Sequence, residues 1–412
     1  MRTYYNGRGA IIKISYLLES VGLTGGNLVI FKHMDALVAA GHTVFVVTPY
    51  GYSLWSELRR SQGEVALGYF GNWGALKKVQ LNLRRRFPNF ESCVSDLLRP
   101  RPSRRLKWIT SRLISNCPSS EIVVATHSYT AFAASYLSQN RKVRAYHHMQ
   151  GFEPWFAGNK HIESTIAPAY HLPLKRFANC SWLAQFVCEE GAGAIPVVHP
   201  GVDHKLFSPL DIRSGCLGSI SNESTLLKSD SFTTGSDDTS DGLPTLRILS
   251  YCDPRPLKGW KESVGAMEIV FSRVRKICSI EWHVFGHGIA AGSKVPITHH
   301  GFLSHKRLAE LYRSSDLFFL PSWFESFPLQ PLEAMASGTA VVTTRIGTED
   351  YARDEQTALI VEPRSSTHLA DAILRLVIDD ELRRYLVVNG HKVAREFTWE
   401  RSGEQLLSVL DL

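Results

Sequence analysis

The sequence has no run of roughly eighteen consecutive apolar residues, the length that a helix needs to cross a membrane. Its seven cysteines are scattered and include no Cys-x-x-Cys pair, which argues against a disulfide framework or a zinc ribbon. The first residues, Met1 to Arg8, are polar and too irregular for a secretory signal. We therefore expect a cytoplasmic protein with reduced thiols and no structural metal.

A strong charge of either sign is also missing. The chain of 412 residues carries a net charge of +7, which suits an anionic ligand or an anionic membrane surface and requires neither. We expect no nucleic-acid partner. Hydrophobic residues make up 44% of the sequence, which is enough to build the cores of two domains of ordinary size.

The most informative stretch joins a predicted strand at 317–320 to a predicted helix at 331–338. Glu325 lies in the loop between them and Glu333 in the first turn of the helix. Open α/β sheets bind ligands at the carboxyl edge of their strands, so two carboxylates there can hold a hydroxyl-rich ligand. The alternative is that Glu333 only complements the helix dipole and Glu325 is a solvated loop residue.

Residues 10–48 are predicted to form a strand, a glycine-rich turn, a helix ending near Gly41, and a second strand. Gly25 and Gly26 lie where the helix begins. Backbone amides at such a position can bind a phosphate or a hydroxyl. The glycines can equally be simple turn formers.

Histidines follow two further predicted strands, at 121–126 and 142–146. His127 follows the first strand, and His147 and His148 follow the second. Polar residues directly after buried strands line the ligand-binding edge of a parallel sheet. Taken singly, each histidine is more often a hydrogen-bonded edge residue than a catalyst.

Strands and helices alternate in both halves of the chain, which predicts an α/β protein with two Rossmann-like parallel-sheet domains facing each other across a cleft. Residues 211–245 are rich in Ser, Thr, Gly and Asp and predict a flexible connector. The predicted divisions are a first domain at 1–207, a connector at 208–245, a second domain at 246–396, and a C-terminal helix at 397–412 that packs back toward the first domain.

Glu325 and Glu333 are spaced Glu-x7-Glu, and Ala-Met-Ala-Ser-Gly follows them. Other motifs accompany this spacing: Arg255 and Lys258 in Pro-Arg-Pro-Leu-Lys-Gly, Pro321-Ser322, Phe285-Gly286, Asp316 and Phe397-Thr-Trp-Glu400. Together they resemble the donor-binding domain of glycosyltransferase family 4, whose two-domain fold is called GT-B. The resemblance is strong from about 247 to 400, and weaker but continuous from Gly22 to Phe207.

This resemblance implies a retaining hexosyl transfer from a nucleotide-sugar to a glycan or lipid-linked acceptor, as in polysaccharide biosynthesis, with no cofactor. It implies that Glu325 holds hydroxyls of the donor sugar and Glu333 the ribose. His148 corresponds roughly to the family's first-domain histidine, with His127 as the alternative. The other implied donor-binding positions are Gly25, Gly26, Gly286, Gly301, Phe302, Phe327 and Leu329.

Breaking a sugar–diphosphate bond builds negative charge on the leaving phosphates, and a cationic group must already be aimed at it. A metal would need an Asp-x-Asp after a strand, and none is so placed. Arg255 and Lys258 can supply the charge instead, which predicts metal-independent transfer. The alternative is that both are solvated loop cations.

The sequence departs from the family pattern in two places. Many relatives have glycine where Ser326 and Pro328 stand, and proline has no amide hydrogen to offer a phosphate. The segment 146–154 resembles a subgroup with a Gln-x-x-Glu-Pro element, so Gln150 and Glu153 rival His148 as the important first-domain residue.

Other functions fit less well. Residues 286–291 match Gly-x-Gly-x-x-Ala, but Gly292 and Pro296 interrupt the helix that a dinucleotide-dependent oxidoreductase would need there. A non-catalytic sugar-nucleotide-binding protein would not need Arg255 and Lys258 beside both glutamates. An epimerase or a phosphorylase with the GT-B fold is a further alternative.

A basic segment at 76–114 interleaves positive and apolar side chains. It predicts a peripheral contact with an anionic membrane, since the sequence contains no predicted spanning helix and a lipid-linked acceptor lies at a membrane. The alternative is a solvated basic face that packs on the sheet, because Pro88, Pro100 and Pro102 break any long amphipathic helix.

Overall fold

A computed structural model describes residues 10–20, 25–62, 102–156, 158–189, 193–209, 243–287 and 292–412, with the side chains of 59–62 left out. The chain forms two compact units: unit 1 comprises residues 1–199 with 402–412, and unit 2 comprises 200–401. The division falls shortly before the predicted one at 207, because Val202 N donates to Phe397 O at 2.9 Å and ties this segment to unit 2. Most of the predicted connector and residues 76–101 of the basic segment lie outside the described residues.

Unit 1 contains a six-stranded sheet in the order β3-β2-β1-β4-β5-β6, parallel except for the β2–β3 pair. Its strands are β1 Lys13–Leu17, β2 Thr43–Thr48, β3 Gly51–Leu54, β4 Ile122–Ala125, β5 Arg144–Met149 and β6 Lys175–Ala178. Its helices are α1 Gly25–Ala39, α2 Trp55–Gln62, α5 Pro102–Asn116, α6 Ser128–Arg141, α7 Glu153–Phe156, α8 Lys160–Ile166, η1 Ala167–His171, α9 Ser181–Val187 and most of α15 Trp399–Val409.

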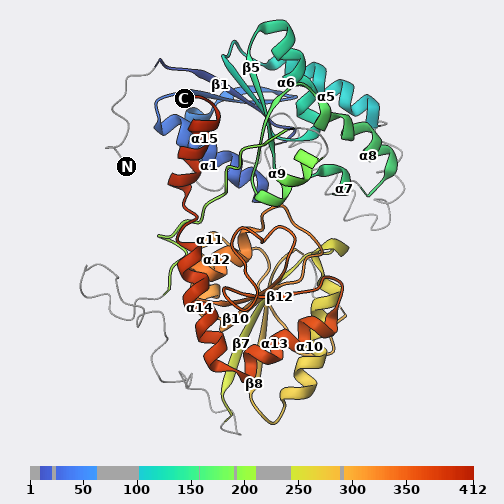
Figure 1. Cartoon of the computed structure of the whole chain (residues 1–412), viewed down its shortest axis with the longest axis vertical. Helices are drawn as coiled ribbons and strands as arrows, with labels where there is room; N and C mark the ends of the chain where they lie inside the picture. Colours follow the sequence, from blue (N-terminus) through green and yellow to red (C-terminus); the bar gives the residue numbers. More distant parts are fainter. Residues whose placement is uncertain are drawn as a thin grey trace, which may run out of the picture. The chain divides into compact units, whose positions relative to one another are not determined.

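Helices cover both faces of this sheet (Figure 1). On one face, α1 and α15 enclose a core with alternate residues of β1, such as Ile14 and Tyr16. Ser402 of α15 also contacts α1, where its Oγ lies 3.1 Å from His33 Nε2. On the other face, α5 packs on α6, and α6 packs on β4 and β5. Burial on both faces explains why these strands are continuous apolar runs in the sequence.

Unit 2 contains a second six-stranded sheet, entirely parallel, in the order β12-β11-β10-β7-β8-β9. Its strands are β7 Thr245–Cys252, β8 Ser279–Gly286, β9 Thr298–His299, β10 Leu317–Leu320, β11 Ala340–Thr344 and β12 Leu359–Val361. Its helices are η4 Pro256–Lys258, α10 Trp260–Val274, α11 His305–Arg313, α12 Leu329–Ala336, α13 Ser366–Ile378 and α14 Asp380–Ala394. Helices α10 and α13 pack together on one face, while α14 packs on α12 and β11 and also joins the core of α10 and α13 through Leu386 (Figure 1).

The predicted fold class, α/β with two Rossmann-like parallel-sheet domains, is confirmed. The strand at 317–320 has the predicted bounds. Three helices follow β12, and Asp379 separates the first two, since it ends α13 and its side chain caps α14. No helix in the described part of the chain is long and apolar enough to span a membrane.

Two local predictions need correction. Strand β5 continues through His147 and His148 to Met149, because β5 keeps pairing with β6 up to Met149 opposite Ala178. The two histidines therefore lie within the strand and not after it. Helix α12 begins at Leu329, two positions before the predicted start, so Glu333 lies in its second turn.

Candidate functional site

In unit 2, the strand order reverses between β7 and its neighbour β10. From β7 the chain continues on one side through β8 and β9, and on the other side through β10 to β12. The turn after β7 and the loop after β10 therefore lie at the same carboxyl edge, where doubly wound sheets bind ligands. The turn carries Arg255 and Lys258, and the loop carries Glu325.

Lys258 and Glu325 form an ion pair across this reversal point. Lys258 Nζ donates to Glu325 Oε1, and the two side chains are only 14% and 13% exposed. Such shielding from water makes the pair much stronger than a surface ion pair. The structure thus brings together two of the predicted site residues.

Arg255 is held by a residue that the sequence did not single out, Asp253. Its Nε and Nη2 each donate to the carboxylate at 2.8 Å, and its backbone N donates to Asp253 Oδ1 at 2.9 Å. Burial opposes ionisation of Asp253, but these hydrogen bonds and the positive charge of Arg255 lower its pKa. The pairing uses one edge of the guanidinium and fixes its direction, while the arginine side chain stays 59% exposed.

Two glycines allow neighbouring segments, the turn after β7 and the segment after β11, to approach the loop after β10 closely. Gly259 has φ +71°, and a Cβ there would lie 2.2 Å from Pro321 O. Gly347 has φ +99°, and a Cβ there would lie 2.5 Å from Glu325 O. Both positions require glycine for conformation and for space. Neither was predicted, although the Lys-Gly pair at 258–259 is a visible turn signal.

Trp323 connects the loop after β10 to the turn after β7. Its backbone N donates to Leu257 O at 2.7 Å, and its Nε1 donates to Glu262 Oε1 at 3.2 Å. The guanidinium of Arg364 lies over its ring, 4.1 Å from the centroid. These contacts fix the backbone on either side of the Lys258–Glu325 pair, and no sequence pattern marks them.

Glu333 is buried on the inner face of α12. Burial raises the pKa of its carboxyl to about 8, so a large fraction is protonated at neutral pH. Its carboxylate has no hydrogen bond or ion pair with any described residue. A buried carboxyl of this kind is suited to a ligand that brings its own hydrogen-bond donors.

The predicted base-side residues lie near the end of β8. Gly286 N donates to Gly301 O at 2.9 Å, which joins the two segments. Gly286 has φ +116°, and a Cβ there would lie 2.4 Å from the ring of Tyr251, so this glycine is required for packing. Phe302 is 68% exposed and meets the ring of His287 at an edge.

Phe327 and Leu329 are both buried. The ring of Phe327 packs on Tyr351, with 5.3 Å between centroids. A donor contact from either residue would therefore use its backbone. Leu329 opens α12, so its amide is among those without an acceptor inside the helix.

In unit 1, His148 is an interior residue. It is fully buried in β5, stacks on Phe177 at 4.5 Å and lies 5.0 Å from the ring of His33. Burial holds the pKa of His148 well below its usual value, and neither ring nitrogen has a hydrogen-bond partner among the described residues. The neighbouring His147 is equally buried, and burial lowers its pKa to about 4.

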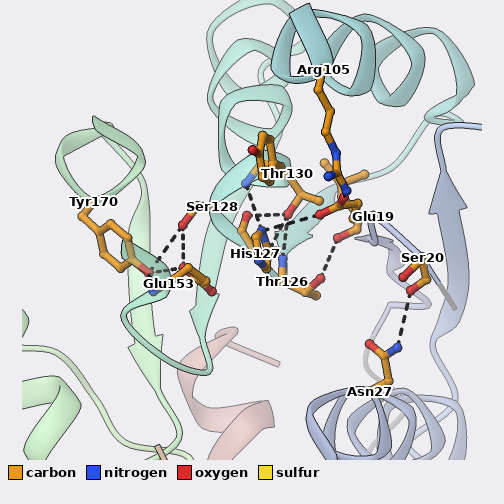
Figure 2. A network of polar contacts seen from close by, with 12 residues as sticks. Glu19, Ser20, Asn27, Arg105, Thr126, His127, Ser128, Thr130, Glu153 and Tyr170 are labelled. Atoms are coloured by element: carbon orange, nitrogen blue, oxygen red, sulfur yellow. Dashed lines mark hydrogen bonds and ion pairs between the residues drawn. The ribbon is translucent and has the colours of Figure 1, made fainter. Parts of the chain in front are cut away.

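His127 lies at the strand-order reversal of unit 1, between β1 and β4 (Figure 2). It caps α6, since its Nδ1 accepts from Tyr129 N at 3.2 Å. The same nitrogen is 3.9 Å from Glu19 Oε2, and Arg105 pairs with Glu19. Because Nδ1 is the acceptor, neutral His127 carries its proton on Nε2 and offers a donor there. The sequence did not identify Glu19, and it assigned Arg105 to the basic segment at 76–114 and not to this site.

Gln150 and Glu153 follow β5 at the same edge. A Cβ at Gly26 would lie 3.0 Å from Gln150 Oε1, so the start of α1 packs closely on this side chain. Around Gly25 there is open space. Glu153 accepts hydrogen bonds from Ser128 and Tyr170, two residues that were not predicted (Figure 2). No described residues form a cluster of three or more side chains able to hold a metal.

Comparisons with known proteins identify the fold and a family match in part of the chain. Residues 290–393 match the family model described as Glycosyl transferases group 1. Solved structures similar over the whole chain include Anabaena HepE with UDP-glucose, at TM-score 0.67 and 14% identity, covering 97% of this chain and 99% of that chain. Sucrose-phosphate synthase from Thermosynechococcus elongatus has a TM-score of 0.63 and 17% identity, covering 97% and 98%. The fold is GT-B.

Curated relatives match over about a quarter of this chain. The D-inositol 3-phosphate glycosyltransferase of Actinosynnema mirum is 41% identical over 103 residues, which is 25% of each chain. An uncharacterized glycosyltransferase of Methanocaldococcus jannaschii is 32% identical over 111 residues, covering 26% of this chain and 28% of the relative. The match thus spans about a quarter of these relatives. Within this GT-B fold, Lys258, Glu325 and Arg255 come together in unit 2, and His127, Gln150 and Glu153 share an edge in unit 1.

Proposed function

We propose that this protein is a retaining glycosyltransferase of family 4 that moves a hexose from a nucleotide-diphosphate sugar to a glycan or lipid-linked acceptor. The observation that carries the proposal is the set of charges at the strand-order reversal of unit 2. There Lys258 and Arg255 are each held by a carboxylate, Glu325 and Asp253. The match to group 1 glycosyltransferases over residues 290–393 supports it.

The chemistry follows from charge. As the bond between the sugar and the diphosphate breaks, negative charge develops on the leaving phosphate oxygens. Arg255 and Lys258 stabilise it, because both are already oriented and need no reorganisation during the reaction. Amides at the start of α12, beginning with Leu329, and of Gly25 and Gly26 in unit 1 are further donors to phosphate in this proposal.

Glu325 binds hydroxyls of the donor sugar, and Glu333 binds the ribose hydroxyls. Phe302, exposed beside Gly301, is the residue against which the base lies. Uridine is the base to test first, because the similar HepE structure holds UDP-glucose. No divalent cation is required in this scheme, since the two basic side chains supply the positive charge.

Three measurements test this proposal. Calorimetric titration with UDP, GDP, ADP and dTDP identifies the base, and failure to bind any of them would refute a nucleotide-sugar enzyme. NMR of the product reports the anomeric configuration, and inversion would refute the retaining mechanism. Loss of transfer in EDTA that magnesium or manganese restores would refute metal independence. Release of an epimerised sugar or a sugar phosphate would indicate the epimerase or phosphorylase.

We also propose that helix α5, the described part of the basic segment, contacts an anionic membrane. Arg104, Lys107 and Trp108 are exposed on it, and its buried residues are Ile109 and Leu113. Arg105 is not available to lipid in the same way, because it pairs with Glu19 and lies 5.3 Å from the ring centroid of Tyr129.

Flotation with anionic vesicles tests this contact. Binding should weaken with salt and be lost when Arg104 and Lys107 become glutamine. Arg105→Gln should have a smaller effect on flotation. Absence of flotation at low salt would mean that no such contact exists.

A further inference from the structure

An aromatic cluster lies on unit 1, in the segments that follow β5 and β6. We call it the aromatic shelf, and its members are Phe152, Trp155, Tyr170, Trp182 and Phe186. Phe152 and Tyr170 lie 4.6 Å apart by centroid, Trp155 and Phe186 4.8 Å, and Trp155 and Trp182 5.8 Å with their planes only 7° from parallel. Trp155 is nevertheless 44% exposed. The shelf therefore presents an indole to solvent on a packed aromatic support.

The shelf adjoins a carboxylate whose position is fixed. Ser128 Oγ donates to Glu153 Oε2 at 2.5 Å, and Tyr170 donates to the same oxygen (Figure 2). Glu153 N in turn donates to the Tyr170 hydroxyl oxygen at 3.0 Å. Ser128 is fully buried and Tyr170 nearly so, which makes the support rigid. Ser128 and Tyr170 both donate to Glu153 Oε2. As far as the described residues are concerned, this leaves Glu153 Oε1 able to accept a hydrogen bond from a ligand.

Tyr170 belongs to both arrangements, since its ring packs in the shelf and its hydroxyl holds Glu153. The apolar surface and the carboxylate are therefore one site. This site lies at the carboxyl edge of the sheet, after β5, and His127 follows the adjacent strand β4 at the same edge. Ligands of doubly wound sheets bind along that edge.

We propose that the shelf and Glu153 form a binding site for a sugar ring of the acceptor, and this rests on the proposed function. A pyranose has a face of C–H groups and a rim of hydroxyls. Its face can lie on the Trp155 indole while a hydroxyl donates to Glu153 Oε1, which is the combination of aromatic surface and few fixed polar groups found in ligand sites.

A lipid surface fits this site less well. Interfacial tryptophans do occur at membranes, but acyl chains offer no donor to a fixed carboxylate, and anionic headgroups are repelled by it. The carboxylate beside the shelf thus favours a hydroxyl-bearing ligand over a bilayer.

The test is binding of the full chain to an array of immobilised mono- and oligosaccharides of glucose, galactose, mannose, rhamnose and N-acetylglucosamine. Trp155→Ala and Glu153→Gln should each weaken binding to the preferred sugars at least about tenfold. Trp108→Ala is the matched control, because Trp108 is 45% exposed on α5, outside the shelf. The circular dichroism spectrum and melting temperature of each variant show that it is folded, and Glu153→Gln preserves side-chain shape.

Binding to none of these sugars, or equal losses in Trp155→Ala and Trp108→Ala, would overturn the inference. So would flotation on neutral vesicles that depends on Trp155 in the absence of sugar binding, since the shelf would then contact lipid. UDP titration of the same variants separates the two proposals. Sugar binding that depends on Trp155, in a protein that binds no nucleotide, would support the site and refute the proposed function.

Discussion

The strand-order reversals of the two units both carry a carboxylate beside a basic side chain, but the two pairs are held differently. In unit 2, Lys258 and Glu325 are in direct contact and mostly shielded from water. In unit 1, Glu19 pairs with Arg105, and their side chains are 22% and 48% exposed, while the acceptor Nδ1 of His127 lies 3.9 Å from Glu19. A shielded pair acts as a preorganised electrostatic device, whereas an open pair can rearrange around different ligands. In the proposed function, the shielded pair of unit 2 serves the constant diphosphate group, and the open pair of unit 1 serves the variable acceptor.

The two units also differ in the kind of ionisable side chain that they bury. Unit 1 buries three histidines, His33, His147 and His148, all of which burial keeps neutral. Unit 2 buries Glu333, whose pKa burial raises to about 8. Acid should therefore lower the stability of unit 1, and base should lower the stability of unit 2.

The largest effect is expected from a variant that breaks the Lys258–Glu325 pair of unit 2. Lys258→Ala should slow transfer by ~2–3 kcal/mol of transition-state stabilisation, roughly 30- to 150-fold, because a pre-aimed cation is lost. It should also lower the free energy of unfolding by about 1–3 kcal/mol, since Glu325 is left shielded and unpaired. Steady-state kinetics and urea unfolding measure the two effects.

Two variants serve as controls for Lys258→Ala. Arg255→Ala should slow transfer to a similar extent and should also lower the free energy of unfolding, because Asp253, whose side chain is only 3% exposed, loses its charged partner. Lys261→Ala, at an exposed position, should change neither quantity. Unchanged turnover in Lys258→Ala would remove the preorganised pair from the proposed mechanism.

The difference between the two units also explains which site residues could be predicted from the sequence. Glu325, Lys258 and Arg255 were found because their roles leave motifs of fixed spacing after apolar strands. Asp253 and Trp323 were missed because their importance comes from the partners that folding brings to them. In unit 1, Glu19, Ser128 and Tyr170 follow no such motif, so only the structure joins them to His127 and Glu153.

The fold was more predictable than the site. Strands buried on both faces are apolar runs, so their positions were visible in the sequence. The end of β5 was misplaced because polar residues usually signal the end of a strand, and His147 and His148 are polar residues inside one. A start at Pro331 was expected for α12, but Pro331 occupies the third helical position.

The second prediction concerns the proton on Glu333. Ribose hydroxyls donate hydrogen bonds, so they favour the ionised carboxylate, and UDP affinity should rise as the pH increases toward 8. At pH 7, calorimetry in buffers of different ionisation enthalpy should show proton release on binding. Glu333→Gln should abolish this release, and Glu333→Ala should weaken binding by about 1.5–3 kcal/mol. Binding of UDP to Glu333→Ala within twofold of the wild type would show that Glu333 does not contact the ligand.

The third prediction uses the opposite titrations of the two units. The histidines of unit 1 have folded pKa values below the usual 6.5, about 3 for His33 and about 4 for His147, so stability is lost as pH falls from 6.5 toward 4. At about 1.4 kcal/mol per pKa unit, this loss should reach a few kcal/mol. Glu333 has a raised folded pKa, so its contribution is present below about pH 4.5 and lost as pH rises through 8.

Hydrogen exchange can assign each loss to its unit. At pH 5, protection should fall in β5 and α1 relative to pH 7, while α12 keeps its protection. At pH 8.5 the weaker element should be α12, and UDP should restore it. Parallel loss in both units at either pH would contradict the assignment of these groups.

The smallest expected effect concerns His127, which caps α6 in unit 1. His127→Ala should lower the free energy of unfolding by ~1 kcal/mol, because Tyr129 N loses its side-chain acceptor. His127→Asn should restore that stability, since asparagine is a good N-cap, but it removes the outward Nε2 donor. If His127 contacts a substrate, transfer should fall in both variants, whereas a purely structural role predicts that His127→Asn transfers at the wild-type rate. Urea unfolding and steady-state kinetics on the same preparations distinguish these outcomes, and Tyr136→Ala, at an exposed position of the same helix, is the control.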